Sequence, residues 1–232
     1  MRILMVCLAM LAGCSSTPTG NMNADASFRQ HAARALEEMW QEFPEFAVRM
    51  GNYKYADPLT VPDQGRRERW VAFYDRQLAA LATFDPAALN ASSRVDFELM
   101  KNRFERNRWY ITTFKSWQWQ PSTYNVGPDL DLVLDTEYAP LDVRLRQTLA
   151  RLDKVPAYYA AAKSSLADPT AEHIDLALRQ SEGTLALFGA EGRHSGLRRV
   201  SRNAERHAQL SHRAGALPAE ICLRDPVGLH RR

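Results

Sequence analysis

Cysteine is scarce in this sequence, and its scarcity excludes whole classes of protein. Only three cysteines occur among 232 residues, which is too few for a disulfide framework. No apolar run reaches the about 20 residues that a membrane-spanning helix needs, so a multi-span membrane protein is excluded as well. Hydrophobic residues make up 45% of the chain and charged residues 25%, which is the composition of a folded protein and not of a disordered or collagen-like one.

The motifs of several enzyme classes are also absent. The chain has no Gly-x-Ser-x-Gly turn, no glycine-rich phosphate loop and no Cys-x-x-Cys pair. A catalytic zinc site on a helix uses two histidines one turn apart with a glutamate between them. His31 and His173 stand far apart in the sequence, and neither lies in that pattern. We therefore predict no catalytic, cofactor-binding or metal-ligating residue in this chain.

Two clusters of polar or aromatic residues are candidates for function. A run of carboxylates (Asp129, Asp131, Asp135, Glu137) could perform acid–base or glycosidic chemistry without a metal. The interpretation we favour is the start of a helix, where acidic side chains are stabilised by the helix dipole. Five aromatic residues (Trp109, Tyr110, Trp117, Trp119, Tyr124) are expected to belong to the core and not to a binding platform.

The N-terminus has the pattern of an export signal. Arg2 precedes an unbroken apolar run, and Leu11-Ala12-Gly13-Cys14 follows it, which resembles a bacterial lipobox. We predict a signal peptide over residues 1–13, lipid attachment at Cys14 and a polar tether over residues 14–26. Ser15 after the cysteine resembles the sorting signal for the outer membrane. An ordinary signal peptide, or an apolar start that is never cleaved, are the alternatives.

Apolar residues at helical spacing predict an all-α domain over residues 27–190. Ser27 is the expected first cap, and helices are expected to end at Phe43-Pro44 and near Asp85-Pro86. Ser93 and Asp96 resemble a capping box, and residues 118–128 are expected to form a loop. Further helices are expected from Pro140, Pro156 and Thr170. No segment alternates with a period of two, so we expect no sheet.

The last forty residues have a different composition. Residues 193–232 hold nine arginines, three acids and no lysine, and all aromatic residues lie at or before Phe188. A basic arm for nucleic acid or anionic lipid is one interpretation, but the absence of aromatic side chains argues against nucleic acid, and we predict no nucleic-acid partner. A second interpretation is a helix from Leu197 to Leu210. We favour a tail over residues 191–232 that is translated out of frame or disordered.

Four segments of the body carry a resemblance to a known family. They are residues 43–57 (Phe43-Pro44-Glu45-Phe46 through Tyr55-Ala56-Asp57), residues 93–97, residues 151–156 and residues 169–172. In this order they resemble the N-terminal part of the bacterial "domain of unknown function 885" family, whose members are often exported lipoproteins. The resemblance covers about residues 28–190.

The resemblance implies a helical, zincin-like fold related to metallocarboxypeptidases and dipeptidases, with zinc as cofactor and peptides as substrates of full-length relatives. The His-Glu-x-x-His-type motif of the family lies downstream of this region, and nothing here matches it. Three hypotheses remain. In the first, the chain is an inactive N-terminal half of such a protein, anchored in the outer membrane and facing the periplasm. In the second, it is a complete, non-enzymatic envelope lipoprotein that binds a partner through its helical lobe and basic tail. In the third, it is a metal-free hydrolase that uses the carboxylates at 129–137.

Overall fold

The computed structural model describes residues 21–188, and helices make up most of this part of the chain. No strand occurs among residues 21–188, so the all-α prediction is confirmed. The predicted signal peptide, Cys14 and the Arg-rich tail at 191–232 lie outside the described residues. The main helices are α1 (Met22–Glu42), α2 (Pro44–Arg49), α3 (Gln64–Leu81), α4 (Ala91–Trp109), α5 (Ser116–Trp119), α6 (Gly127–Asp135), α7 (Leu141–Leu152), α8 (Val155–Ser165) and α9 (Ala171–Phe188).

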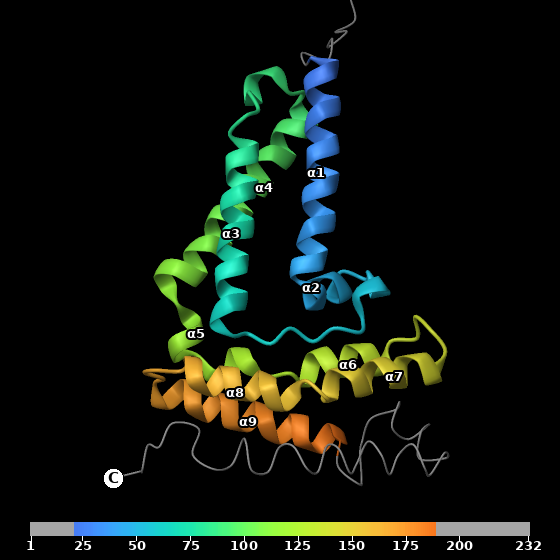
Figure 1. Ribbon diagram of the computed structural model, residues 1–232, viewed down its shortest axis with the longest axis vertical. Helices are drawn as coiled ribbons and strands as arrows, with labels where there is room; N and C mark the ends of the chain where they lie inside the picture. Colours follow the sequence, from blue (N-terminus) through green and yellow to red (C-terminus); the bar gives the residue numbers. More distant parts are fainter. Residues whose placement is uncertain (1–20, 189–232) are drawn as a thin grey trace, which may run out of the picture.

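The helices form two layers that run in different directions (Figure 1). Helices α1, α3 and α4 run lengthwise and form what we call the upper layer. Helices α6, α7, α8 and α9 cross beneath their ends and form the lower layer. The short helix α2 contacts both α1 and α6, and so connects the layers. Between residues 21 and 188, no helix is both long and apolar enough to cross a bilayer.

Each layer has its own apolar core, built from the helix faces that the sequence spacing predicts. The upper core contains Phe28, Met39, Phe73, Tyr74, Leu81, Leu89, Phe97 and Phe104. The lower core contains Leu59, Val126, Leu130, Leu134, Leu145, Leu152 and Val155. A small third cluster of Val48, Ala56 and Val133 lies at the junction of the two layers. Beside it the rings of Tyr53 and Tyr138 stack with their centroids 3.9 Å apart.

Helix α1 begins before the predicted cap at Ser27, and residues 22–26 of the predicted tether are helical. The cap is Asn21, whose side chain accepts a hydrogen bond from the backbone N–H of Asn23 at 3.0 Å. Asp25 links the first turn of α1 to the upper layer. Its carboxylate accepts hydrogen bonds from the Asn90 N–H at 3.0 Å and the Asn90 side-chain amide at 2.7 Å. Tertiary contacts therefore extend the helix beyond its amphipathic part.

The predicted capping box of α4 is also wrong. Asn90 is the cap, and its side-chain oxygen accepts the Ser93 N–H at 2.9 Å. Ser93 lies inside the helix and is buried against the upper core. The same asparagine thus caps α4 and holds the start of α1, which joins the first turns of the two helices.

The expected loop at 118–128 is largely helical. A π-helical turn (Tyr110–Phe114) continues α4 and ends at Lys115, which has a left-handed backbone with φ of 49°. The short helix α5, a 3-10 turn (Pro121–Tyr124) and the start of α6 follow. Indole N–H groups of Trp117 and Trp119 donate to the carbonyls of Ile111 and Phe114 at 3.0 and 3.1 Å. These bonds satisfy carbonyl groups of the π-helical turn.

Arg151 of α7 is buried, with no exposed side-chain surface, although it is charged. Its Nε donates to the Ala56 carbonyl at 2.6 Å, and its Nη atoms lie 3.4 and 3.5 Å from the carbonyl oxygens of Asp129 and Tyr55. Burial lowers the pKa of Arg151, while the carboxylates of Glu45 and Asp129 act in the opposite direction. The guanidinium thus joins α7 to α6 and to the segment that follows α2.

Replacing Arg151 is expected to destabilise the protein strongly. In Arg151→Met the carbonyls of Ala56, Asp129 and Tyr55 lose their donor, and we expect a loss of about 3 kcal/mol in the free energy of unfolding. Urea titration followed by far-ultraviolet circular dichroism measures it. The control Arg146→Ala removes an exposed arginine that pairs with Asp142 on the same helix, and it should change stability by less than about 0.5 kcal/mol. Equal effects of the two changes would contradict a joining role for Arg151.

Candidate functional site

Asp129, the first residue of the carboxylate run, forms an ion pair. Asp129 lies in the first turn of α6, as the helix-start interpretation predicts. Its two oxygens accept hydrogen bonds from Nε and Nη2 of Arg49, both at 3.0 Å. This is the two-point ion pair that arginine forms with a carboxylate. Asp129 therefore fastens α2 to α6, and the geometry supports a structural role over the metal-free hydrolase hypothesis.

The five aromatic residues predicted to lie in the core divide into two groups. Tyr124 is buried, and its hydroxyl donates to the Trp117 carbonyl at 2.7 Å. Trp109 and Tyr110 are instead exposed by 45% and 43%, so the core prediction is wrong for these two. Trp109 lies on the side of α4 opposite Phe97 and Phe104 by helical spacing, and Tyr110 begins the π-helical turn, so neither belongs to the upper core.

The two histidines of the body take separate structural positions. His31 is buried in α1, and its ring lies 5.5 Å from the ring of Phe84. His173 lies in the first turn of α9 with its ring 5.1 Å from that of Trp119. Among residues 21–188, no group of three or more His, Cys, Asp or Glu side chains is placed to hold a metal ion. Since catalytic zinc takes three protein ligands, the described donor set does not fit the zinc that the family resemblance implies.

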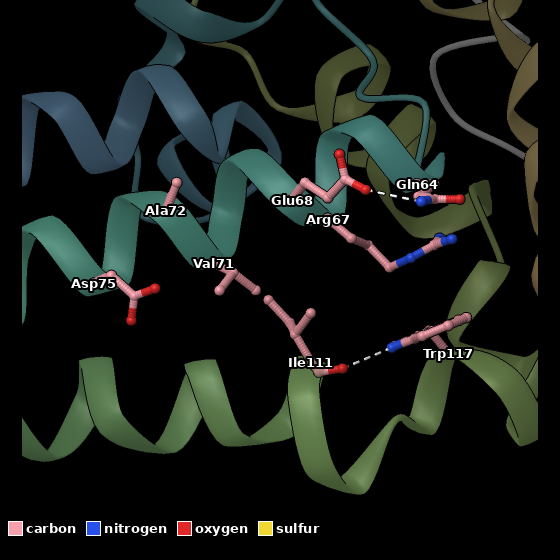
Figure 2. Close-up of a pocket in the computed structure, with 8 residues that line it drawn as sticks. All are labelled: Gln64, Arg67, Glu68, Val71, Ala72, Asp75, Ile111 and Trp117. Atoms are coloured by element: carbon pink, nitrogen blue, oxygen red, sulfur yellow. Dashed lines mark hydrogen bonds between the residues drawn. The ribbon is translucent and has the colours of Figure 1, made fainter.

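A groove of about 470 Å³ lies between α3 and the π-helical turn. Its lining comes from α3 on one side and from the π-helical turn and α5 on the other, as Figure 2 shows. The lining residues are Gln64, Arg67, Glu68, Val71, Ala72, Asp75, Ile111 and Trp117. Val71 and Ile111 face each other across the middle of the groove (Figure 2).

The polar side chains at the groove form cation–π contacts and hydrogen bonds with neighbouring residues. The guanidinium of Arg67 lies over the Trp117 ring, 4.1 Å from its centroid, which is a cation–π arrangement. One of its nitrogens also donates to the Pro62 carbonyl at 2.6 Å and to the Ser165 hydroxyl at 3.0 Å. Glu68 accepts a hydrogen bond from Gln64 at 2.8 Å. The groove is therefore preformed.

The acidic groups that line the groove are the carboxylates of Glu68 and Asp75. None of its lining residues is a serine, cysteine or histidine, so it offers neither a hydroxyl or thiol nucleophile nor an imidazole base. The sequence analysis missed this groove. Arg67 and Trp117 come from distant parts of the chain, and no local pattern indicates that they meet.

A comparison with protein families identifies one family for this chain. A family model described as "Bacterial protein of unknown function (DUF885)" matches residues 44–221. The matched range ends inside the segment at 191–232, whose origin stays a prediction. No curated protein matches the chain. A solved structure from Shewanella oneidensis, described as a candidate lipoprotein of unknown function, is similar with a TM-score of 0.76 and 33% identity. The similarity covers 84% of this chain and 36% of that chain, so this chain spans about a third of its relative.

The burial of His31 predicts how stability depends on pH. Desolvation lowers the pKa of His31 below its usual value of 6.5, with a smaller contribution from Arg34 in the same direction, while Glu38 opposes it. The unfolded chain therefore binds this proton more readily, and stability should fall as pH drops below about 6.5. Chemical unfolding between pH 7.5 and about 5 measures the slope. His31→Leu should flatten this slope. An unchanged slope in His31→Leu would show that His31 is not the group.

Proposed function

Because the chain belongs to the bacterial DUF885 family, we propose that it is an exported lipoprotein that forms the N-terminal, non-catalytic lobe of a peptidase-like fold. Anchored through Cys14, it would lie at the outer membrane and face the periplasm. The lobe itself would supply a helical wall beside a peptide-binding region and would not carry the reactive groups.

The observation that carries this proposal is the donor set of the described residues. Residues 21–188 hold no cluster of three potential metal ligands, and no serine, cysteine or histidine lines the groove. The chain also spans only 36% of the Shewanella relative. In a full-length relative, the zinc motif that the resemblance implies would lie in the part that this chain does not match. We derive no zinc-dependent step for this chain.

The proposed anchor follows from the N-terminal sequence. The apolar run, the small residues Ala12 and Gly13, and Cys14 stand in the order of a lipobox. The description of the Shewanella relative as a candidate lipoprotein supports the same assignment. Two acyl chains on one cysteine would give stable attachment, where a single chain gives only marginal binding.

A second candidate function is a complete, non-enzymatic lipoprotein that binds a partner through the helical lobe and the basic tail. The family match favours it in one respect, because the match includes residues 191–221 and thus part of the segment that we interpret as out of frame. The downstream DNA separates the two candidates. A zinc motif in another frame after the stop codon supports the inactive lobe, and its absence from all frames supports the complete binding protein.

The anchor is tested by removing its attachment point. Cys14→Ser should abolish acylation, stop processing by the lipoprotein signal peptidase and move the mature protein out of the outer-membrane fraction. Cell fractionation, labelling with radioactive palmitate and mass spectrometry of the N-terminus measure these effects. The control Cys222→Ser changes another cysteine outside the predicted lipobox and should behave like the wild type. Palmitate incorporation that persists in Cys14→Ser would overturn the assignment.

The proposal that the lobe has no catalytic metal site of its own is tested with zinc. The purified chain, incubated with zinc and then dialysed, should retain less than one zinc per chain by atomic absorption. Any peptide hydrolysis in the preparation should not change when a chelator is added. Stoichiometric zinc that is lost in His173→Ala, together with chelator-sensitive hydrolysis, would show that the lobe has a metal site of its own.

A further inference from the structure

Helix α4 carries apolar side chains on two opposite faces. One face, with Phe97 and Phe104, lies in the upper core. The other face carries Val95, Leu99 and Trp109, which are exposed by 58%, 64% and 45%. At 3.6 residues per turn these three positions lie on one side of the helix, opposite the buried phenylalanines. A helix at the surface of a soluble domain normally presents polar residues there.

The exposed apolar surface continues past the end of α4. Tyr110 and Phe114 of the π-helical turn are exposed by 43% and 39%. The Phe114 ring stacks on Trp109 with centroids 5.2 Å apart and an interplanar angle of 19°. We call the set Val95, Leu99, Trp109, Tyr110 and Phe114 the outer stripe. Its aliphatic residues lie near the start of α4 and its aromatic residues at the end.

Two exposed basic side chains, Arg106 and Lys115, accompany the outer stripe. Arg103 instead lies over the Phe46 ring, and Arg108 pairs with Asp75 of α3. The segment 91–115 contains six basic residues and three acidic ones, whereas residues 21–188 as a whole contain more acidic than basic residues. Arg106 lies on the same side of α4 as Leu99 and Trp109, by helical spacing. The basic residues of the segment are Arg94, Lys101, Arg103, Arg106, Arg108 and Lys115. Exposed Trp and Tyr with neighbouring Lys and Arg are typical of surfaces that contact the interface of a bilayer.

The start of α4 also lies close to the proposed anchor. The Asn21 N–H donates to the Ala88 carbonyl at 2.9 Å, and Asp25 accepts two hydrogen bonds from Asn90. These hydrogen bonds therefore position Asn21 near the first turn of α4. The seven residues that lead from Cys14 to Asn21 span at most about 25 Å. A lipid on Cys14 would hold this end of α4 within reach of the bilayer.

We propose that the outer stripe of α4 is a membrane-contact face, which lies on a bilayer surface that contains anionic phospholipid. Apolar burial of the stripe and attraction of its basic neighbours to the headgroups supply the binding. The proposal rests on the lipoprotein assignment above and adds an orientation to it. The lobe is held at two points, by the acyl chains and by α4, so that α4 runs along the membrane.

A fluorescent probe at matched positions tests this orientation. In a Cys222→Ser background, Leu99→Cys and Met50→Cys are each labelled with nitrobenzoxadiazole, after acylation of Cys14 has been confirmed by mass spectrometry. The two native side chains are exposed by 64% and 62%, but Met50 lies at the end of α2, away from the stripe. The protein is placed in vesicles of phosphatidylcholine, with or without about 30% phosphatidylglycerol.

We expect the probe at position 99 to shift to shorter wavelength in the anionic vesicles, and the probe at position 50 to stay unshifted. Arg106→Ala should lower the ratio of membrane-bound to free α4 about fivefold, from the loss of one basic side chain. Arg146→Ala, on α7, should leave it unchanged. Equal responses at positions 99 and 50 would overturn the proposal. A shift at 99 that grows with protein density at constant lipid would instead indicate a second copy of the chain, and would also overturn it.

The membrane-contact face and the lipid anchor can be tested independently of each other. The same pair of labelled positions is compared in a protein that carries both Cys7→Ser and Cys14→Ser and is added to the vesicles, so each comparison is internal to one state of acylation. If acylation is missing but the probe at position 99 shifts selectively, the lipid-anchor proposal is refuted and the membrane-contact face is supported. If acylation is normal but no selective shift occurs, the anchor is supported and the membrane-contact face is refuted.

Discussion

The buried guanidinium of Arg151 is the interaction on which the junction of the two layers depends. Removing a charge from water is unfavourable unless its hydrogen bonds are satisfied, and here the partners are the carbonyls of Tyr55, Ala56 and Asp129. These carbonyls belong to the segment after α2 and to the start of α6. One side chain from α7 thereby fixes two segments that no strand or disulfide of the described chain connects. The Arg49–Asp129 ion pair ties the same turn of α6 to α2.

This junction decides what the lobe can do. With α2 and α6 held together, the upper layer stands on the lower one as Figure 1 shows, and α3 keeps its position relative to α5. The groove exists only because of that position, since Arg67 comes from α3 and Trp117 from α5. Arg67 also reaches Ser165 of α8, so the groove is coupled to the lower layer. These contacts fix the placement of α3, α5 and α8 around the groove.

The sequence predicted the helices and their core faces because apolar spacing is a local property. It could not predict the caps at Asn21 and Asn90, since both depend on the contact between the starts of α1 and α4. Arg151 was beyond prediction for a related reason: arginine is mostly exposed, and only the fold brings three carbonyls to it. Trp109 and Tyr110 were assigned to the core because aromatic residues usually bury. Helical spacing places Trp109 on the outer face of α4, opposite Phe97 and Phe104, and the π-helical turn that begins at Tyr110 has no clear sequence signature.

Helix α4 packs through one face and leaves apolar residues exposed on the other. Its inner face needs only Ser93, Phe97 and Phe104 to pack against α1 and α3, and folding places no demand on its outer face. A soluble surface would gain solubility from polar residues at Val95 and Leu99. Exposed apolar residues there give no stability to residues 21–188, so their stabilising effect must come from contact with something outside the lobe. A bilayer, unlike a protein partner, requires no matching shape. That suits a stripe that is apolar and basic but has no groove along it.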